Sequence, residues 1–245
     1  MDIHEKMVRL DLAALYRLIH RMGIDHRIYN HHSARLPDDE DHILINAFGL
    51  LQEEVTASNL IRVNRDGLSE NNMSSANQAG AIIHWGIYDA RDDIQCIVHH
   101  HSAASVAVSS LKEGLLPISQ GAMQFHNRIG YHDYEGLSFS KEEQPRLAKS
   151  LGSHRAMLLK HHGALICGRC IAEAYVLTDD LEKACRVQLM AMQSGGEVVL
   201  PEESIREHAA TQFEGMPQPR GAEDDWPAAL RSLDRMGIDY KGEFT

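Results

Sequence analysis

The 245-residue sequence has few of the features that mark membrane, secreted or nucleic-acid-binding proteins. No apolar run approaches the roughly 18 residues that a membrane span needs, and residues 1–6 hold no apolar signal-peptide core. Acidic residues outnumber basic ones by 35 to 24, which gives a net charge of −11. Because a protein that binds nucleic acids or anionic membranes needs clustered Lys and Arg, this negative net charge argues against either as a partner. We therefore expect a cytoplasmic protein with neither a nucleic-acid nor a membrane partner.

Cysteines and linker segments are scarce as well. The four cysteines include the CxxC pair Cys167 and Cys170, but no second pair is present to complete a zinc site. In a chain that shows no signal peptide, such cysteines are expected to be reduced. No linker rich in Gly, Ser and Pro divides the chain. This favours one main domain at 1–215 and a C-terminal extension with a short helix at 216–245.

Histidine, by contrast, is abundant, with 16 residues. Three of them, His99, His100 and His101, follow the apolar pair Ile97–Val98 and precede Ser102, a residue type that caps helices. This order predicts a strand that ends at a functional site. Because side chains alternate across a strand, His99 and His101 should face one way and His100 the other. Two imidazoles on one face form half of a metal site, although the run is also compatible with a merely polar strand end.

A second histidine pair stands in a similar setting. Residues 156–168 contain an apolar run, the pair His161–His162, a glycine and a second apolar run. The pattern predicts two strands joined by a turn, and the pair supplies the third imidazole that a metal site needs. His84 lies within a helix predicted at 77–90. A lone histidine in a helix is usually a structural group, so we expect His84 at most to orient a metal ligand by a hydrogen bond.

The segment 130–136 places several side chains that titrate or form hydrogen bonds between two glycines. Such a loop is either a site or a solvated turn, and its two tyrosines favour the site because they are costly to leave in water. Its candidate proton donors are Tyr131, His132, Tyr134 and Glu135.

Together these motifs resemble those of the class II aldolase and adducin head-domain superfamily. The superfamily's His-x-His-Ser pattern is matched by residues 99–102, its Leu-x-x-His-Gly pattern by 159–163, and its closing helix by the stretch around 181–185. The resemblance extends from residue 4 to about 195. It is closest to an adducin-like branch, which has Asn-His near residue 30 and Tyr-His-Asp-Tyr-Glu-Gly near residue 131.

This resemblance implies a fold, an assembly and a cofactor. The fold would be a three-layer α/β/α domain around a mixed, mainly antiparallel sheet, assembled as a homotetramer or another homo-oligomer with sites near subunit boundaries. The cofactor would be one divalent metal per subunit, bound by His99, His101 and His162. Zinc is the usual ion, with manganese or ferrous iron as alternatives.

The chain departs from the sugar-phosphate aldolases of this superfamily at three substrate-contacting places. A Ser-Ser-Glu run, which supplies phosphate contacts and an acid/base carboxylate, falls on Gln78–Gly80, so glycine replaces the carboxylate. A Thr-Gly phosphate loop reads Phe48–Gly49, and a Gly-Asn turn reads Asn30–His31. A phenyl ring cannot donate a hydrogen bond to phosphate. We therefore expect an unphosphorylated carboxylate substrate to contact Asn30, His31, Phe48, Gly49 and Gly80.

The predicted function is a metal-dependent lyase that cleaves a carbon–carbon bond of a small hydroxy, keto or hydroxyaromatic carboxylate. Retro-aldol cleavage requires a base for the hydroxyl proton, whereas decarboxylation requires only an acid that protonates the carbanion afterwards. The missing carboxylate at Gly80 thus favours decarboxylation. Two alternatives stay open: a non-haem iron oxygenase on the same scaffold, because three histidines also suit Fe²⁺, and a non-catalytic binding module like the adducin head.

Overall fold

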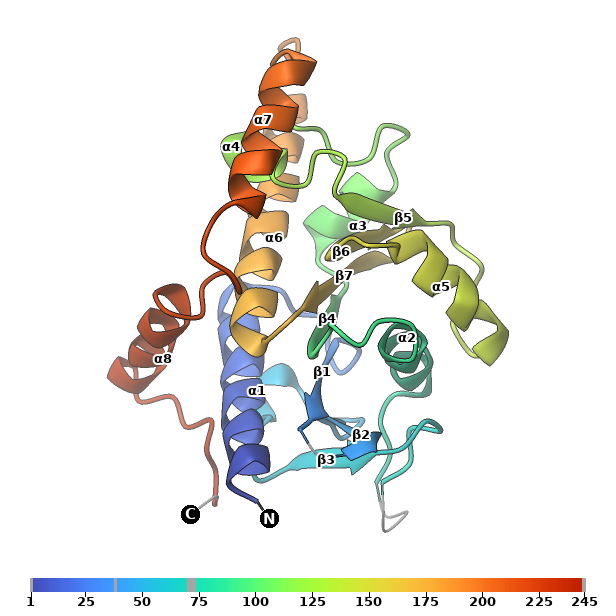
Figure 1. The fold of residues 1–245 in the computed structure, drawn as a ribbon, viewed down its shortest axis with the longest axis vertical. Coiled ribbons are helices and arrows are strands. Elements are labelled where there is room, and N and C mark those ends of the chain that lie inside the picture. Colours follow the sequence, from blue (N-terminus) through green and yellow to red (C-terminus); the bar gives the residue numbers. More distant parts are fainter. Residues whose placement is uncertain (1, 38, 70–73, 244–245) are drawn as a thin grey trace.

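The computed structural model describes residues 2–37, 39–69 and 74–243, in which one seven-stranded sheet lies between two layers of helices (Figure 1). The strands are β1 (His31–Leu36), β2 (Asp39–Asn46), β3 (Leu60–Val63), β4 (Cys96–His100), β5 (Ile129–His132), β6 (Ala156–Leu159) and β7 (Gly163–Gly168). The helices are α1 (Ile3–Arg21), α2 (Gln78–Tyr88), α3 (Ala103–Ser109), α4 (Gln120–Met123), α5 (Gln144–Leu151), α6 (Ile171–Gln193), α7 (Glu203–Glu214) and α8 (Asp225–Arg235), with 3₁₀ turns η1 (Gln52–Glu54) and η2 (Lys141–Glu143).

The sheet has the strand order β3-β2-β1-β4-β7-β6-β5. Strands β5 and β6 run parallel, and the other neighbouring pairs are antiparallel. The predicted fold class, a three-layer α/β/α domain around a mixed, mainly antiparallel sheet, is therefore confirmed.

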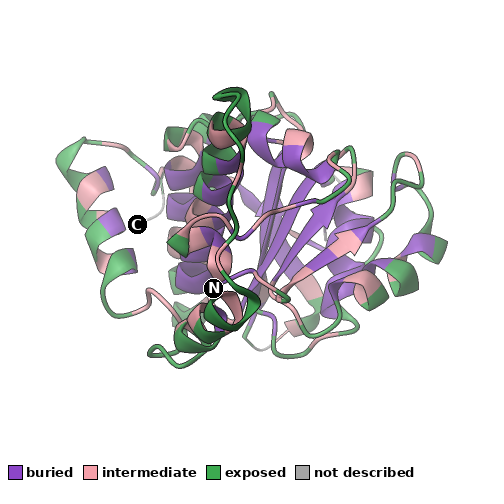
Figure 2. Ribbon diagram, turned by 90° about the horizontal axis from the view of Figure 1, so that it is seen from above, coloured by how far each residue is buried: buried purple, intermediate pink, exposed green. Residues whose placement is uncertain are grey.

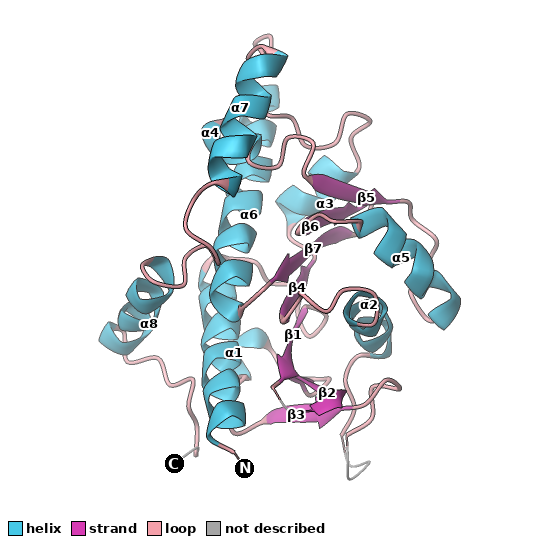
Figure 3. Cartoon of the chain, in the orientation of Figure 1, coloured by secondary structure: helices cyan, strands magenta, loops and turns pink. Residues whose placement is uncertain are grey.

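Each face of the sheet carries its own hydrophobic core (Figures 2 and 3). Helices α1, α3, α6 and α8 contribute to the core on one face, where Cys96 and Val98 of β4 point. Helices α2 and α5 contribute to the core on the other face, where Ile97 points. Strand β4 is the middle strand of the sheet and all five of its residues are buried. Its C-terminal end therefore brings histidines into the interior of the molecule.

The residue after these histidines fixes where β4 ends. The Ser102 hydroxyl accepts a hydrogen bond from the Ser105 amide and so caps α3, as its residue type predicts. The same hydroxyl donates to the buried carboxylate of Glu182 in α6, at 2.5 Å. Ser102 thus joins the end of the central strand to the longest helix of the layer behind it.

Two parts of the chain differ from the expectation drawn from sequence. Segment 130–136, expected to be a loop, starts inside strand β5, which forms a parallel pair with β6. Its polar residues and two glycines are typical of a loop, and only its first three residues, 130–132, belong to the strand. Helix α7 has no counterpart in the prediction, since Ala210 is its only buried residue and it therefore lacks a clear apolar stripe.

The C-terminal segment packs on its own chain. Helix α8 agrees with the short helix expected there, and its residues Trp226, Ala229 and Leu233 join the core beside α1 and α6. The division into a domain at 1–215 and an extension at 216–245 stays a prediction. Among the described helices, none combines the length and the hydropathy that a membrane crossing requires.

Candidate metal centre

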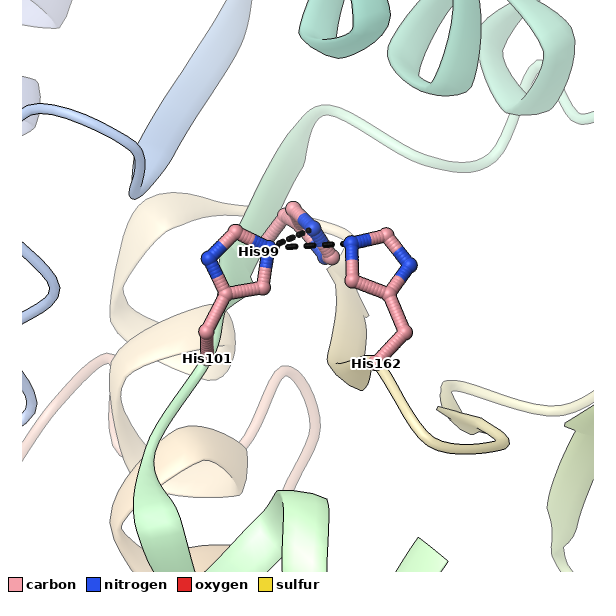
Figure 4. Close-up of side chains that lie close together, drawn as sticks. All are labelled: His99, His101 and His162. Atoms are coloured by element: carbon pink, nitrogen blue, oxygen red, sulfur yellow. Dashed lines mark hydrogen bonds between the residues drawn. The ribbon is translucent and has the colours of Figure 1, made fainter. Parts of the chain in front are cut away.

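Three histidine side chains from two separate parts of the chain point toward one another at the end of β4 (Figure 4). The Nε2 atoms of His99 and His101 lie 2.9 Å apart, and those of His101 and His162 lie 3.0 Å apart. A tetrahedral zinc ion with Zn–N distances of about 2.0–2.1 Å would hold its ligand nitrogens about 3.3 Å apart. Small outward movements of the rings would thus let these three residues hold one divalent ion.

Two of the three rings are oriented by hydrogen bonds on the nitrogen that faces away from the centre. His99 Nδ1 lies 2.9 Å from the Ala164 carbonyl oxygen, to which it donates, so its Nε2 keeps a lone pair. His101 Nδ1 lies 3.0 Å from Nδ1 of His26. Metal-binding histidines commonly have such outer partners, which fix the tautomer of the ring. The arrangement therefore suits metal ligation through Nε2.

Burial keeps these rings neutral. Removal from water, reinforced by the neighbouring imidazoles, lowers the pKa of His101 to about 3 and holds the pKa of His99 well below its usual 6.5. Burial also lowers the pKa of His162 to about 4. Since a metal binds the neutral form of imidazole, the three rings are ready as ligands at neutral pH.

A tight turn between β6 and β7 delivers His162, and not His161, to the centre. A Cβ atom at Gly163 would lie 2.2 Å from the carbonyl oxygen of His100, so only glycine lets β7 approach β4 this closely. His161 has a positive φ of 60° and its Nδ1 lies 3.1 Å from the Ser110 hydroxyl. Of the predicted pair, the second histidine is thus the one that meets His99 and His101.

His100 behaves as the alternation of a strand requires. Its Nδ1 accepts a hydrogen bond from the Ser102 amide, and its ring is fully buried on the face opposite His99. This placement makes His100 a natural comparison residue for the metal ligands.

Two further candidates, His31 and His84, lie beside the centre. His31 pairs with His99 across β1 and β4, and the two ring centroids are 4.8 Å apart. His84 Nε2 lies 2.9 Å from His31 Nδ1, so His84 contacts His31 and not one of the three converging histidines. Gly80, one turn before His84 in α2, faces the His31 ring.

The other predicted substrate contacts lie in two places, one beside the three histidines and one at the surface. The side chain of Asn30 accepts from the His101 amide at 3.1 Å and donates to the Ile24 carbonyl, so it braces the backbone of the centre. Phe48 is 47% exposed, next to Gly49, whose φ of 103° is one that glycine tolerates. The Phe48 and Tyr29 ring centroids lie 6.4 Å apart. Since the Tyr29 ring also lies 5.5 Å from the ring of His26, an aromatic wall leads outward from His101 to Phe48.

Of the four predicted proton donors, three lie near the histidine centre and one does not. His132, Tyr134 and Glu135 line a small pocket together with His162. Tyr131 points to the other face of the sheet, where its hydroxyl accepts from the Leu115 amide at 3.0 Å, so the structure does not bring it to the centre. Tyr134 is 53% exposed, which is contrary to the argument that both tyrosines would avoid water.

Sequence reasoning missed two residues of the site. Glu143 is a buried carboxylate in the same pocket, with Oε1 3.4 Å from His132 Nε2. It belongs to the run Lys141–Glu143, which reads like the solvated first turn of a helix and gives no hint of burial. His26 was missed because an isolated histidine in a loop carries no spacing signal.

A larger cavity, of about 500 Å³, lies at the other end of β6. It is lined by four arginines, and none of the predicted site residues contributes to it. Three of these arginines stand just before β5, β6 and α6, and the fourth lies in the C-terminal segment: Arg128, Arg155, Arg169 and Arg220. Its arginines face carboxylates, for example Arg128 with Glu207 and Arg169 with Glu173, so the cavity has no clear excess of positive charge.

The fold and the cluster of three histidines together indicate the family to which this protein belongs. Residues 10–189 match the family model described as Class II Aldolase and Adducin N-terminal domain, and the chain belongs to that family. The predicted superfamily is thereby confirmed.

The relatives include a named aldolase and an adducin. The chain shares 40% identity with the solved structure of an aldolase II superfamily protein from Pseudomonas syringae, covering 98% of this chain and 97% of that one, with a TM-score of 0.92. It shares 28% identity with an L-fuculose 1-phosphate aldolase from Glaciozyma antarctica PI12, covering 97% and 92% of the two chains, with a TM-score of 0.83. Alpha-adducin of Rattus norvegicus is 37% identical over 252 residues, which cover 96% of this chain but 34% of the adducin.

Proposed function

We propose that this protein is a metal-dependent lyase that cleaves a carbon–carbon bond of a small, unphosphorylated hydroxy, keto or hydroxyaromatic carboxylate, with decarboxylation favoured over retro-aldol cleavage. The observation that carries the proposal is the convergence of three neutral imidazoles beside a helix position, Gly80, that has no side chain. The first feature supports a metal centre, and the second supports a reaction that needs no carboxylate base there.

His99, His101 and His162 are the residues that would hold the ion, and zinc is the ion we expect. When bound, a divalent ion supplies a Lewis acid that accepts negative charge as a carbon–carbon bond breaks. The chain's own contribution is to keep the three rings neutral by burial and to orient two of them, His99 through Ala164 and His101 through His26.

The charge of the substrate can be argued from the residues around Phe48. A phosphate group near Phe48, Ala79 and Gly80 would meet a phenyl ring, a methyl group and no side chain. Each missing charge-assisted hydrogen bond costs about 1.5–3 kcal/mol, so two losses weaken binding about a hundredfold or more. The exposed Phe48 ring is better suited to the flat apolar part of an aromatic or keto acid.

A parallel assay tests this substrate class. We expect the zinc, manganese and ferrous forms to release carbon dioxide or aldehyde from hydroxyaromatic and keto acids and to leave sugar phosphates uncleaved. L-fuculose 1-phosphate belongs in the panel because a relative is named for it. Efficient cleavage of that compound would contradict the proposal and would indicate that the Ser74 and Ser75 hydroxyls form a phosphate site.

The proton donor we favour is His132. It lines the pocket next to His162, its Nε2 makes no well-aligned hydrogen bond within the described part of the chain, and Glu143 lies 3.4 Å from that atom. Its Nδ1 is held 3.0 Å from the Ser150 hydroxyl, which fixes the ring. Glu143 would orient the ring, and Nε2, which is buried in the protein without substrate, would have to become exposed on substrate binding to deliver a proton to the carbanion.

His132→Phe should lower kcat on the best substrate of the panel by about a hundredfold or more, the usual contribution of a positioned acid. Zinc content should be unchanged, since His132 is not one of the converging histidines. Tyr131→Phe is the matched comparison, because this neighbouring residue points to the opposite face of the sheet. An equal loss in both variants would mean that β5 matters only for packing.

Two other functions have specific support. The aldolase relative at 28% identity supports retro-aldol chemistry on a sugar phosphate. In addition, the Phe48 amide donates a hydrogen bond to the Ser75 carbonyl, which keeps Ser74 and Ser75 near Phe48. The adducin relative supports a non-catalytic module. A non-haem iron oxygenase would differ from all of these by oxygen uptake in the ferrous form.

We also expect a homotetramer or another homo-oligomer. Next to the pocket, Tyr134, Leu137 and Phe139 are 53%, 72% and 57% exposed. Apolar side chains gathered on a surface in this way commonly mark a contact between proteins, which supports an interface near the site.

A further inference from the structure

The space in front of Gly80 is occupied by the imidazole of His31. A Cβ atom at position 80 would lie 2.9 Å from three atoms of that ring, Cδ2, Cε1 and Nε2, a distance that real Cβ atoms essentially never show. His31 itself is 3% exposed, so its ring has little room to move aside. The glycine is thus the condition for His31 to stand where it does.

One nitrogen of this ring is anchored by a buried chain of hydrogen bonds. His31 Nδ1 lies 2.9 Å from His84 Nε2, and His84 Nδ1 lies 2.5 Å from the Ser33 hydroxyl. That hydroxyl in turn lies 2.9 Å from the hydroxyl of Tyr88. All of these side chains are buried, so the ring is held from behind in one orientation.

The other nitrogen, Nε2, is available. In the described part of the chain this nitrogen has no hydrogen-bond partner. It is also not one of the completely buried nitrogens that lack a partner, so it stays accessible. The ring stacks at a tilt beside His99, with the centroids 4.8 Å apart. A polar atom that is accessible and unpaired, on a side chain that is otherwise buried and oriented, is in position to bind a ligand.

We propose that His31 Nε2–H is a hydrogen-bond donor to the substrate, holding an oxygen of its carboxylate or of the enolate that forms as the carbon–carbon bond breaks. This inference rests on the proposed function and names a residue that would do its binding. The role requires no change in the charge of His31, because a neutral imidazole carries one N–H.

The buried chain allows the proton to be on Nε2. Tyr88 donates to the Ser33 carbonyl, which leaves the Ser33 hydroxyl free to donate to His84 Nδ1. His84 then donates from Nε2 to His31 Nδ1, and the remaining N–H of His31 is on Nε2. A negatively charged substrate oxygen in front of Nε2 favours this tautomer over its reverse. His84 is accordingly a positioning residue.

Oxalate is the probe that we would use, because it is a flat dianion with two neighbouring oxygens like an enolate carboxylate. In calorimetric titrations of the zinc-loaded protein, His31→Ala should weaken oxalate binding about ten- to a hundredfold, the effect of one hydrogen bond to a charged group. His31→Gln, whose amide can donate, should recover part of the loss. His208→Ala, an exposed histidine in α7, should bind oxalate like the wild type.

Zinc affinity separates the two proposals. It should change by less than about threefold in His31→Ala, since His31 makes no hydrogen bond to the three converging histidines. If zinc and carboxylate bind normally but His31→Ala leaves oxalate affinity unchanged, the donor role is wrong and the proposed function stands. Loss of zinc in His31→Ala would overturn the role as well, because His31 would then help to hold the metal. A wild-type protein that binds no zinc would overturn both.

The dependence of His31 on Gly80 can be tested without metal or substrate. In the metal-free protein, Gly80→Ala should lower Tm by about 3–10 °C, the effect of overpacking a buried site. In the His31→Ala background the same change should be neutral or stabilising, because alanine favours a helix. Gly121→Ala, where an added Cβ would meet no atom within 4 Å, is the control. Additive effects of the two changes would show that His31 does not occupy this space.

Discussion

Zinc should bind the wild-type protein with one ion per chain, and His99→Ala or His162→Ala should bind it at least about a thousandfold more weakly, since loss of a mere outer partner already costs 10–100-fold. The reason is geometric. The three Nε2 atoms converge with separations of 2.9 and 3.0 Å along the His99–His101–His162 series, and two imidazoles alone cannot complete the set. Competition with a fluorescent chelator, together with elemental analysis, measures the loss.

His100→Ala is the control for this experiment. His100 lies on the same strand and is equally buried, but its ring lies on the opposite face of the sheet. It should therefore destabilise the fold to a similar degree while keeping zinc affinity close to that of the wild type. If all three variants lost zinc equally, the alternation of side chains along β4 would not be what selects the ligands.

Mild acid should unfold the metal-free protein. Five histidines are buried, and burial is the main cause that lowers the pKa of each below 6.5: to about 4 for His32, about 3 for His84 and His100, and to well below 6.5 for His31 and His99. The native state keeps them neutral while the unfolded chain takes up protons below pH 6.5, so acid favours the unfolded state. Their stabilising contribution is thus complete above pH 6.5 and is lost as pH falls toward 4.

The expected size of this effect is large. At pH 5 each of the three histidines with a pKa of about 3 or 4, His32, His84 and His100, costs about 2 kcal/mol relative to neutral pH, so these three together cost about 6 kcal/mol, a large part of the stability of a typical domain. Urea unfolding in the presence of a chelator, measured between pH 7.5 and 5, should show this decline. His100→Gln removes one titrating group and should reduce the slope by the contribution of that one histidine. A free energy of unfolding that stays constant over this range would mean that these rings are protonated in the folded state.

Much of the site could be predicted from the sequence because its signals are local. The period of two along β4 separates His99 and His101 from His100, and the structure has them on opposite faces. Likewise, Gly163 after a histidine pair marks a turn, and the turn brings His162 to the centre. These inferences needed only the geometry of a strand and the tendency of glycine to stand at turns.

The parts that could not be predicted depend on contacts that no regular spacing in the sequence marks. Nothing near Glu143 indicates that it is buried against His132, because the partner comes from the parallel pairing of β5 with β6. In the same way, the loss of a side chain at Gly80 has meaning only once β1 brings His31 in front of it. Tyr131 was misjudged for a related reason, since a loop has no fixed alternation and a strand does.

The pairing of β4 with β7 has a consequence for how the protein folds. His99 lies opposite Leu165 in this pair, so the strands that carry His99 and follow His162 are joined only after more than sixty residues of intervening chain have been closed into a loop. Contacts of such separation form slowly and tend to come after local structure. The helices can therefore form before any ligand set exists, and a partly folded chain offers a metal only scattered histidines. The complete set of three ligands thus forms only when folding is complete, and a bound metal would chiefly lower the rate of unfolding.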